Sequence, residues 1–271
     1  MFSKFKLNKI DYNDVYKYKK DGDDYYKEIK TDIKNSLIEF VGEDGIIDGT
    51  ELQKNWFPIK RTFDVFLSHS HNDESLAISL AGFLKKELDL DTFIDSCLWG
   101  YSNDLLRELD EKYCRSSSDC TLFDYDKRNY STSHVHMMLS IALSRMIDNC
   151  EAVFFLNSEN SISLKEDIDE CRTMSPWIYS ELSLADMIRT RSINYYRSYK
   201  VIERKFKEYE VICESAGLKI GYKVDKILNN FIDLSYGDLV NCKNKWEYNE
   251  QNFQCALDYI YLYKNIISRK I

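Results

Sequence analysis

The feature that most constrains the fold is a strand, a helix and a second strand in immediate succession. The run TFDVFLSHS (62–70) is short, apolar and rich in β-branched and aromatic residues, as buried strands are. NDESLAISLAGFLKKEL (72–88) starts with two helix-capping residues and repeats leucines at helical spacing, and DTFIDS (91–96) is typical of another strand. Such a unit predicts parallel strand pairing with a right-handed crossover.

The pattern continues downstream with more helix and strand signals. After Asp95 we expect a loop that carries Trp99 and Gly100, followed by a charged helix from residue 102. Residues 114–133 are polar and indicate a surface insertion, and HVHMMLSIALSRMIDNC (134–150) predicts an apolar helix. EAVFFLN (151–157) predicts a third buried strand. The chain therefore alternates strands and helices in the manner of an α/β domain.

A further helix start is well specified at SPWIYSE (175–181). Ser175 suits the N-cap, and Pro176 suits the first helical position, where its missing N–H is no loss. Trp177 and Glu181 lie one turn apart, beside an apolar stripe that begins at Ile178. Taken alone, this pair is typical of core packing and a solvated charge.

The remaining segments divide the chain into three parts. Residues 1–60, rich in Lys, Asp and Tyr, predict one or two helices that pack on the main domain through tyrosines and leucines. The main domain covers residues 61–190. Residues 191–271 predict a mostly helical completion of the same globule, with possible edge strands in YEVICES (209–215) and KIGYKV (219–224).

Composition excludes several classes of function. The net charge of −8 and a pI of about 5.2 leave no basic footprint, so binding to nucleic acid or to an anionic membrane is unfavoured. No apolar run approaches the roughly 20 residues of a membrane span, and the first residues hold no signal-peptide core, so we expect a cytoplasmic protein.

The eight cysteines are expected to be reduced. A zinc site from Cys114, Cys120, His134 and His136 is an alternative, but the spacing does not favour it, and we expect no metal.

In this order the motifs resemble a Toll/interleukin-1 receptor (TIR) domain of the bacterial kind. FDVFLSHS resembles the first-strand box of that family, FIDSCLWG its second strand and following loop, and VFFLNSENS with SPWIYSEL its third strand and W-x-x-x-E helix. The resemblance covers residues 63 to about 189, roughly half of the chain. It implies a flavodoxin-like parallel sheet flanked by helices, here with helical additions at both ends.

The resemblance also implies an activity. Catalytic TIR domains cleave NAD⁺ at the nicotinamide–ribose bond, with the helix glutamate as the key residue, which is Glu181 here. NAD⁺ is the substrate and no other cofactor is implied. Bacterial members commonly act in anti-phage defence, and in Thoeris-like systems they make an ADP-ribose-derived signal for a partner effector. Activity in the family usually requires self-association through TIR surfaces, so we expect an isolated chain to be weakly active.

The residues themselves favour such a site. Ligands of parallel sheets bind outside the carboxyl ends of the strands, where the unexplained polar residues fall. A single carboxylate suits cleavage of NAD⁺, because nicotinamide leaves neutral and needs no protonation. The glycine-rich dinucleotide fingerprint is missing, which argues against a dehydrogenase. Beside the catalytic candidate Glu181, the predicted substrate-binding residues are Ser68, His69, Ser70, Asp95, Trp99, Ser175 and Trp177, and 157–161 should join the same crevice.

Two other functions remain open from the sequence. The first is a TIR domain that serves only as a protein–protein interaction module, through the loop at 97–103. The second is a phosphoacceptor or nucleotide-binding protein that uses Asp95 at the end of a strand, although the acidic cluster of a Mg²⁺ site is lacking. Hydrolysis, cyclisation and transfer share one cationic ribose intermediate, so the sequence does not select the product.

Overall fold

The computed structural model describes most of the chain. The described residues are 1–29, 40–42, 45–57, 62–116, 121–165, 170–198, 222–248 and 253–268, and the side chains of 97–101, 164, 165 and 170 are not among them. Within these ranges no helix has both the length and the apolar character needed to cross a lipid bilayer.

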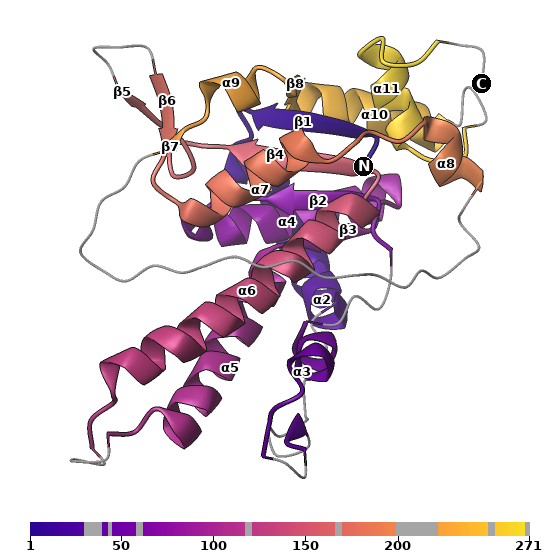
Figure 1. Ribbon diagram of the computed structural model, residues 1–271. Coiled ribbons are helices and arrows are strands. Elements are labelled where there is room, and N and C mark those ends of the chain that lie inside the picture. Colours follow the sequence, from indigo (N-terminus) through magenta and orange to yellow (C-terminus); the bar gives the residue numbers. More distant parts are fainter. Residues whose placement is uncertain are drawn as a thin grey trace.

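A five-stranded parallel sheet forms the centre of the molecule (Figure 1). Its order is β3-β2-β4-β1-β8, and every neighbouring pair is parallel. This confirms the predicted α/β class with a flavodoxin-like sheet. A second, antiparallel sheet has the order β5-β6-β7. The strands are β1 (Ser3–Asn8), β2 (Val65–Ser68), β3 (Thr92–Ile94), β4 (Ala152–Asn157), β5 (Ser163–Lys165), β6 (Glu170–Thr173), β7 (Tyr222–Lys223) and β8 (Ile232–Ser235).

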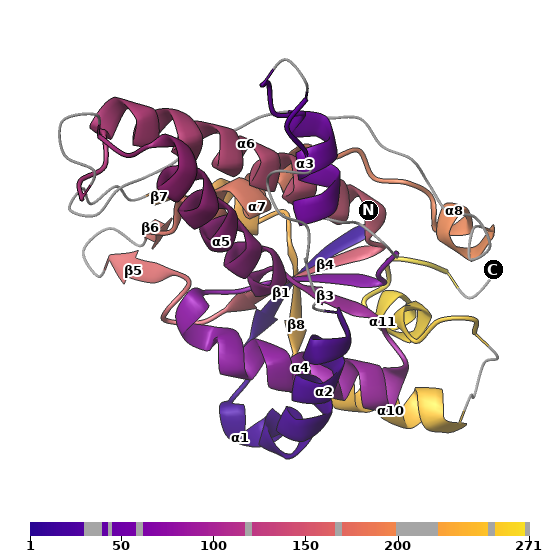
Figure 2. The ribbon, with the colours of Figure 1, turned by 90° about the horizontal axis from the view of Figure 1, so that it is seen from below.

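Helices cover both faces of the central sheet, as Figure 2 shows. One side carries α1 (Tyr12–Val15), α2 (Lys19–Ile29), α4 (Glu74–Leu88) and α10 (Tyr236–Tyr248), and the other carries α3 (Gly49–Trp56), α5 (Ser96–Tyr113), α6 (Tyr125–Asn149) and α7 (Pro176–Met187). The shorter α8 (Ile193–Ser198) and α11 (Leu257–Tyr263) lie toward one end of the sheet, and α9 (Asp225–Leu228) precedes β8. The sheet is therefore buried on both faces, as parallel sheets generally are.

The predicted strands and their connecting helix are confirmed. All four residues of β2 are buried, and β4 is buried over its first five. Leu67 pairs with Ile94, and Ser68 pairs with Phe155. The carboxyl ends of β2, β3 and β4 therefore meet at one edge of the sheet, which is where a ligand of a parallel sheet binds.

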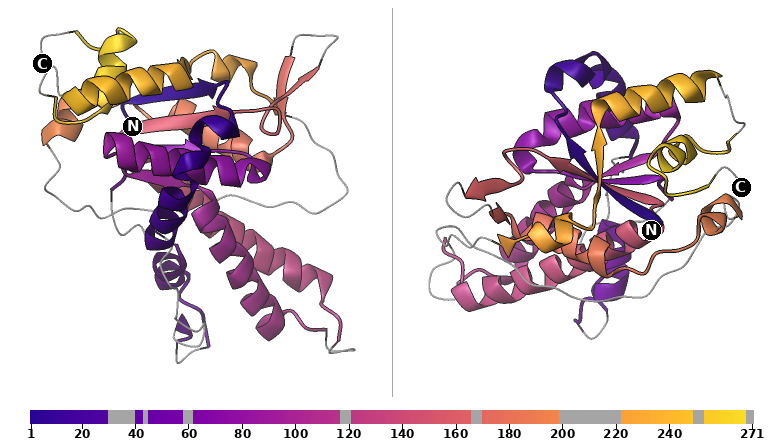
Figure 3. Two further views of the ribbon diagram at one scale, coloured as in Figure 1. Left: turned by 180° about the vertical axis from the view of Figure 1, so that it is seen from behind. Right: turned by 90° about the horizontal axis from the view of Figure 1, so that it is seen from above.

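The expectation that residues 1–60 are only helical is wrong for the first strand. β1 lies inside the sheet between β4 and β8, with Phe5 and Leu7 fully buried (Figure 3). Because Lys4 and Lys6 interrupt the apolar residues, the hydrophobic pattern of the sequence does not indicate a buried strand here. Their ammonium groups are partly exposed and lie 2.5 Å from Asp186 and 3.1 Å from Asp233. A strand can alternate in this way when ion pairs engage the polar side chains.

The expected loop around Trp99 and Gly100 is also wrong, because α5 begins at Ser96 and runs without a break to Tyr113. The segment 114–133 is not simply a loop insertion either, since its second half is the start of α6. Asp124 caps that helix by accepting a hydrogen bond from the Lys127 N–H at 3.0 Å. Helices α5 and α6 form an antiparallel hairpin that extends beyond the sheet (Figure 1).

The C-terminal part supplies strands as well as helices. KIGYKV contributes β7, which confirms an edge strand there, and YEVICES lies outside the described residues. The sequence argument missed β8, which pairs with β1 and forms the edge of the central sheet. Segments from both ends of the chain thus complete one sheet with the strands of residues 65–157.

Helices α2 and α4 approach so closely that glycine is required at their crossing. A Cβ atom added to Gly22 would lie 2.1 Å from the carbonyl oxygen of Ile78. One added to Gly82 would lie 2.5 Å from backbone atoms of Gly22 and Tyr18. This contact explains why the polar α2 carries a glycine near its start despite the lower helix propensity of that residue.

A buried ion network joins the opposite, amino-terminal end of the sheet to α8 and α11. The Arg197 guanidinium donates to both oxygens of Glu151, at 2.7 and 2.8 Å, and also to Asp258. The Tyr261 hydroxyl donates to Glu151 at 3.0 Å. Both carboxylates are almost fully buried, and among the described residues Arg197 is the cation that pairs with both of them.

We predict that Arg197→Met lowers the free energy of unfolding by about 3–5 kcal/mol, because two buried carboxylates lose their cation. Urea denaturation at pH 7 measures this loss. Arg107→Met is the matched control, since Arg107 pairs with Asp104 on the exposed face of α5, and it should change stability by at most about 1 kcal/mol. Equal effects of the two substitutions would contradict the assigned role of Arg197.

Candidate active site

A cavity of about 320 Å³ opens at the carboxyl-terminal edge of the central sheet. Three parts of the chain line it: the segment after β2, the end of β3 with the first turns of α5, and the start of α7. The lining residues are His69, His71, Asp95, Ser96, Asn103, Ser175, Trp177 and Ile178. A cavity at this edge is where the topology of a parallel sheet predicts a ligand.

The start of α7 is built as the sequence predicts. The Ser175 hydroxyl accepts a hydrogen bond from the Ile178 N–H at 3.3 Å, and Pro176 occupies the first helical turn. Ile178, Leu182 and Ala185 are buried on the core side of the helix. With this face held against the core, the side chain of Glu181 points inward rather than to solvent.

Glu181 is buried below the cavity and does not line it. Only 2% of the residue is exposed. The Ser68 hydroxyl, at the end of β2, donates to Glu181 Oε2 at 2.5 Å. Among the described groups, none donates a hydrogen bond to Glu181 Oε1. This side chain is therefore enclosed in the protein and only half satisfied if it is ionised.

Burial raises the pKa of Glu181 well above its ordinary range, and the neighbouring Asp95 carboxylate raises it further. The hydrogen bond from Ser68 acts in the opposite direction but does not cancel these effects. A protonated Glu181 can donate to Asp95, whereas two ionised carboxylates would only repel each other. In this structure the favoured form of Glu181 is thus the neutral acid.

His69 lies on the other side of Asp95. Its Nδ1 is 2.6 Å from Asp95 Oδ1, and both side chains are almost completely buried. Burial opposes the charged imidazolium, but the charge of the adjacent Asp95 outweighs burial and raises the pKa of His69. The order across the site is therefore His69, Asp95, Glu181 and Ser68, with one carboxylate between a cation and a carboxylic acid.

Trp177 lines the cavity and packs against His136 of α6. The two rings meet edge to face, with centroids 5.3 Å apart. Burial lowers the pKa of His136 to about 4, so this imidazole is neutral at pH 7. An indole face beside carboxyl groups suits a flat ligand that carries positive charge.

The structure brings together most of the predicted residues, but not all. His69, Asp95, Ser175 and Trp177 line the cavity, and Ser68 lies beneath it with Glu181. Ser70 is buried at the start of the 3₁₀ turn His71–Asp73 and is not part of the lining. The backbone of Trp99 lies in α5, and its side chain is outside the described residues.

The expected contribution of residues 157–161 to the crevice is wrong. Asn157 donates to the Asn8 side chain at 2.7 Å, across the pair β4 and β1. Ser158 and Asn160 both donate to the carboxylate of Asp73, which anchors this loop to the start of α4. Their polar groups serve the loop instead of a ligand.

Sequence reasoning did not select Ser96 or Asn103 as substrate-binding residues, and it did not place His136 beside Trp177. Ser96 lines the cavity with a buried hydroxyl that has no partner among the described groups. Asn103 was not selected because a loop was expected before residue 102. In the structure α5 is continuous from Ser96, and positions 96 and 103 therefore line the same cavity. His136 was considered only as a zinc ligand, although its place in an apolar helix next to the predicted core was a usable signal.

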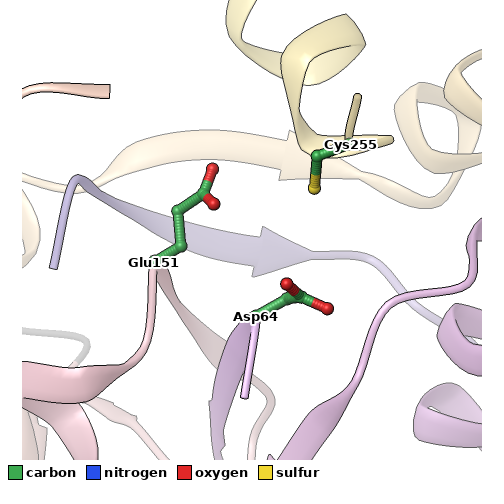
Figure 4. A group of neighbouring side chains, drawn as sticks. All are labelled: Asp64, Glu151 and Cys255. Atoms are coloured by element: carbon green, nitrogen blue, oxygen red, sulfur yellow. The ribbon is translucent and has the colours of Figure 1, made fainter. Parts of the chain in front are cut away.

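The zinc alternative finds no support in the described residues. The thiol of Cys114 donates to Ser131, His134 packs on Tyr130, and Cys120 lies outside the described ranges. The described chain holds one group of three potential ligands elsewhere, Asp64, Glu151 and Cys255, whose ligand atoms lie within 4.8 Å of one another (Figure 4). Since Arg197 already engages both oxygens of Glu151, this group belongs to the ion network and not to a metal site.

Comparisons with known proteins return no match: no protein-family model, no curated protein and no solved structure is similar to the chain.

We predict that Glu181→Gln removes a pH dependence of stability. The folded protein holds a proton on Glu181 that the unfolded chain releases near pH 4.5, so wild-type stability should fall as the pH rises from there through the raised pKa. The slope is about 1.4 kcal/mol per pH unit. Urea unfolding between pH 5 and 8 measures it.

The control for this experiment is Glu159→Gln, which changes an exposed carboxylate at the same edge of the sheet. It should leave the wild-type pH dependence in place. If wild type and Glu181→Gln give parallel stability curves across this range, Glu181 is ionised in the folded protein and the assigned protonation is wrong.

Proposed function

We propose that this chain is an NAD⁺-cleaving enzyme of the TIR type, which breaks the nicotinamide–ribose bond at the cavity above Glu181. One observation carries the proposal. The glutamate of the W-x-x-x-E helix lies buried against Ser68 and Asp95, which lie at the carboxyl ends of the first two predicted strands. A carboxyl with a strongly perturbed pKa beside a cavity is typical of a functional group.

Cleavage of the nicotinamide–ribose bond requires mainly one negatively charged group close to the ribose. As the C1′–N bond breaks, its electron pair moves to the nicotinamide nitrogen and neutralises the positive ring, so the leaving group needs no proton. The ribose becomes an oxocarbenium-like cation, which an ionised Glu181 stabilises. Water then attacks C1′ and releases a proton, which gives ADP-ribose and nicotinamide. An alternative nucleophile at the same carbon would give a cyclic or conjugated product.

The cavity residues have matching roles in substrate binding. Trp177 supplies an aromatic face for the cationic nicotinamide ring, and the unpartnered Ser96 hydroxyl and the Asn103 amide supply polar contacts for ribose or carboxamide. The cavity volume is near the lower end for ligand sites, so we infer that the nicotinamide–ribose half enters and the adenosine half lies outside.

Catalysis requires a change at the cavity floor. Because Glu181 is buried beneath Asp95 and His69, the ribose cannot reach its carboxyl until one of these side chains moves. Glu181 must also lose its proton to act as an anion. The positive charge of bound NAD⁺ favours both events, since it stabilises ionised carboxylates. We therefore propose that the structure represents a closed resting state.

The biological setting is proposed from the same resemblance. In this role the enzyme acts in the cytoplasm as part of anti-phage immunity, and either depletes NAD⁺ or makes an ADP-ribose-derived signal for an effector. Self-association through TIR surfaces is part of the proposal, because opening of the cavity floor by a neighbouring subunit would explain a weak activity in isolation.

We predict that purified protein at high concentration releases nicotinamide from NAD⁺ and that Glu181→Gln lowers the rate by at least about a hundredfold, the usual cost of losing an electrostatic stabiliser. Liquid chromatography with mass spectrometry measures nicotinamide and identifies the ADP-ribose product. Glu159→Gln should retain wild-type activity.

Two outcomes would count against the proposal. Full activity in a folded Glu181→Gln variant would remove the assigned role of that residue. No release of nicotinamide by the wild type, even when it is crowded or supplied with lysate from infected cells, would favour an interaction module that does not turn over a nucleotide.

A further inference from the structure

The cavity floor contains a buried imidazole that the proposed reaction does not use. His69 is 4% exposed, and its Nδ1 lies 2.6 Å from Asp95 Oδ1. Asp95 is 3% exposed, and on its other side its charge raises the pKa of Glu181, which accepts from Ser68 at 2.5 Å. Two carboxyl groups in contact cannot both ionise at low cost. A buried pair of this kind is stabilised by a nearby cation, and His69 lies in that position.

We propose that His69 is a positioning residue that holds the Asp95 carboxylate against Glu181 in the closed site. The inference rests on the proposed function in one respect only, that Glu181 is the group that acts on the substrate. The positioning itself is a property of the resting protein.

Other ionisable groups around the site leave this chain of contacts intact. Glu74, at the start of α4, adds negative charge near His69, and His71 lies on the cavity wall. From α6, the facing group is His136, which is neutral at pH 7. On the elements that pack against α7, Asp225 of α9 accepts from the Cys171 N–H, and Lys4 of β1 pairs with Asp186. Asp95 is thus the charge that acts on Glu181.

The arrangement has a clear consequence for Glu181. While His69 holds Asp95 against Glu181, the neighbouring carboxylate keeps a proton on Glu181 and the cavity stays closed. A cationic ligand that enters next to Asp95 competes with His69 for that carboxylate. Once Asp95 turns toward the ligand, Glu181 loses its anionic neighbour and becomes both more acidic and exposed. Substrate binding and activation of the glutamate are therefore coupled through Asp95.

The test is a ¹³C NMR titration of the Glu181 carboxyl in protein labelled at its side-chain carboxyls, with Glu181→Gln used for assignment. His69→Gln keeps a hydrogen-bond donor but removes the cation, so the carboxyl pair should release its proton at higher pH, by about 1 unit or more. Asp95→Asn removes the repelling charge, so Glu181 should titrate at lower pH by a similar amount. The double variant should behave like Asp95→Asn alone.

Opposite shifts from two neighbouring substitutions are not expected from loosened packing, which would change both titrations alike. The proposal is overturned if folded His69→Gln leaves the Glu181 titration unchanged, or if His69→Gln has the same effect with and without Asp95. Should His69→Gln fail to fold, Asp95→Asn still decides: the titration of the His69 imidazole must fall in this variant, and an unchanged value contradicts the pairing.

The titration needs no turnover, so it separates this inference from the proposed function. Loss of NAD⁺ cleavage with the predicted opposite shifts would refute the enzyme and keep the positioning role. An active enzyme whose Glu181 titration does not shift in these variants would support the proposed function and refute the positioning role of His69. Where activity is present, the acid limb of kcat/KM should move with the Glu181 titration, to higher pH in His69→Gln and to lower pH in Asp95→Asn.

Discussion

The contact among Glu181, Ser68 and Asp95 is the interaction on which the site depends. It joins the ends of β2 and β3 to the first turns of α7, so all three elements must be in place before it forms. The contact is also costly. A carboxyl that is held neutral in the interior against another carboxyl stabilises the fold less than an apolar side chain of similar size. Such an arrangement is typical of functional sites, which often retain groups that lower the stability of the fold.

The parts of this arrangement that follow from local patterns could be predicted from the sequence. Continuous apolar runs gave β2 and β4, because strands that are buried on both faces need no polar alternation. Ser175 and Pro176 predicted the start of α7, since capping depends on neighbouring residues alone. Topology then placed Ser68, Asp95 and Glu181 at the same edge, as the structure shows.

Parts that depend on distant partners could not be predicted. β1 alternates lysines with apolar residues, and in the sheet those lysines pair with the distant Asp186 and Asp233. The loop after β4 has the composition of a ligand site, yet Asp73, more than eighty residues away, accepts its polar groups. The pairing of His69 with Asp95 likewise needs two strands in register, and neither residue predicts the other.

The central claim is that the nicotinamide–ribose half of NAD⁺ occupies the cavity and meets Glu181 after the floor opens. A crystal structure of Glu181→Gln with NAD⁺ tests it most directly, because a slow variant leaves the dinucleotide intact. The account predicts nicotinamide against Trp177, C1′ facing the side chain at position 181, and Asp95 turned away from it. Dinucleotide bound elsewhere, or a residue 181 still enclosed beneath Asp95 and His69 with nicotinamide in the cavity, would contradict it.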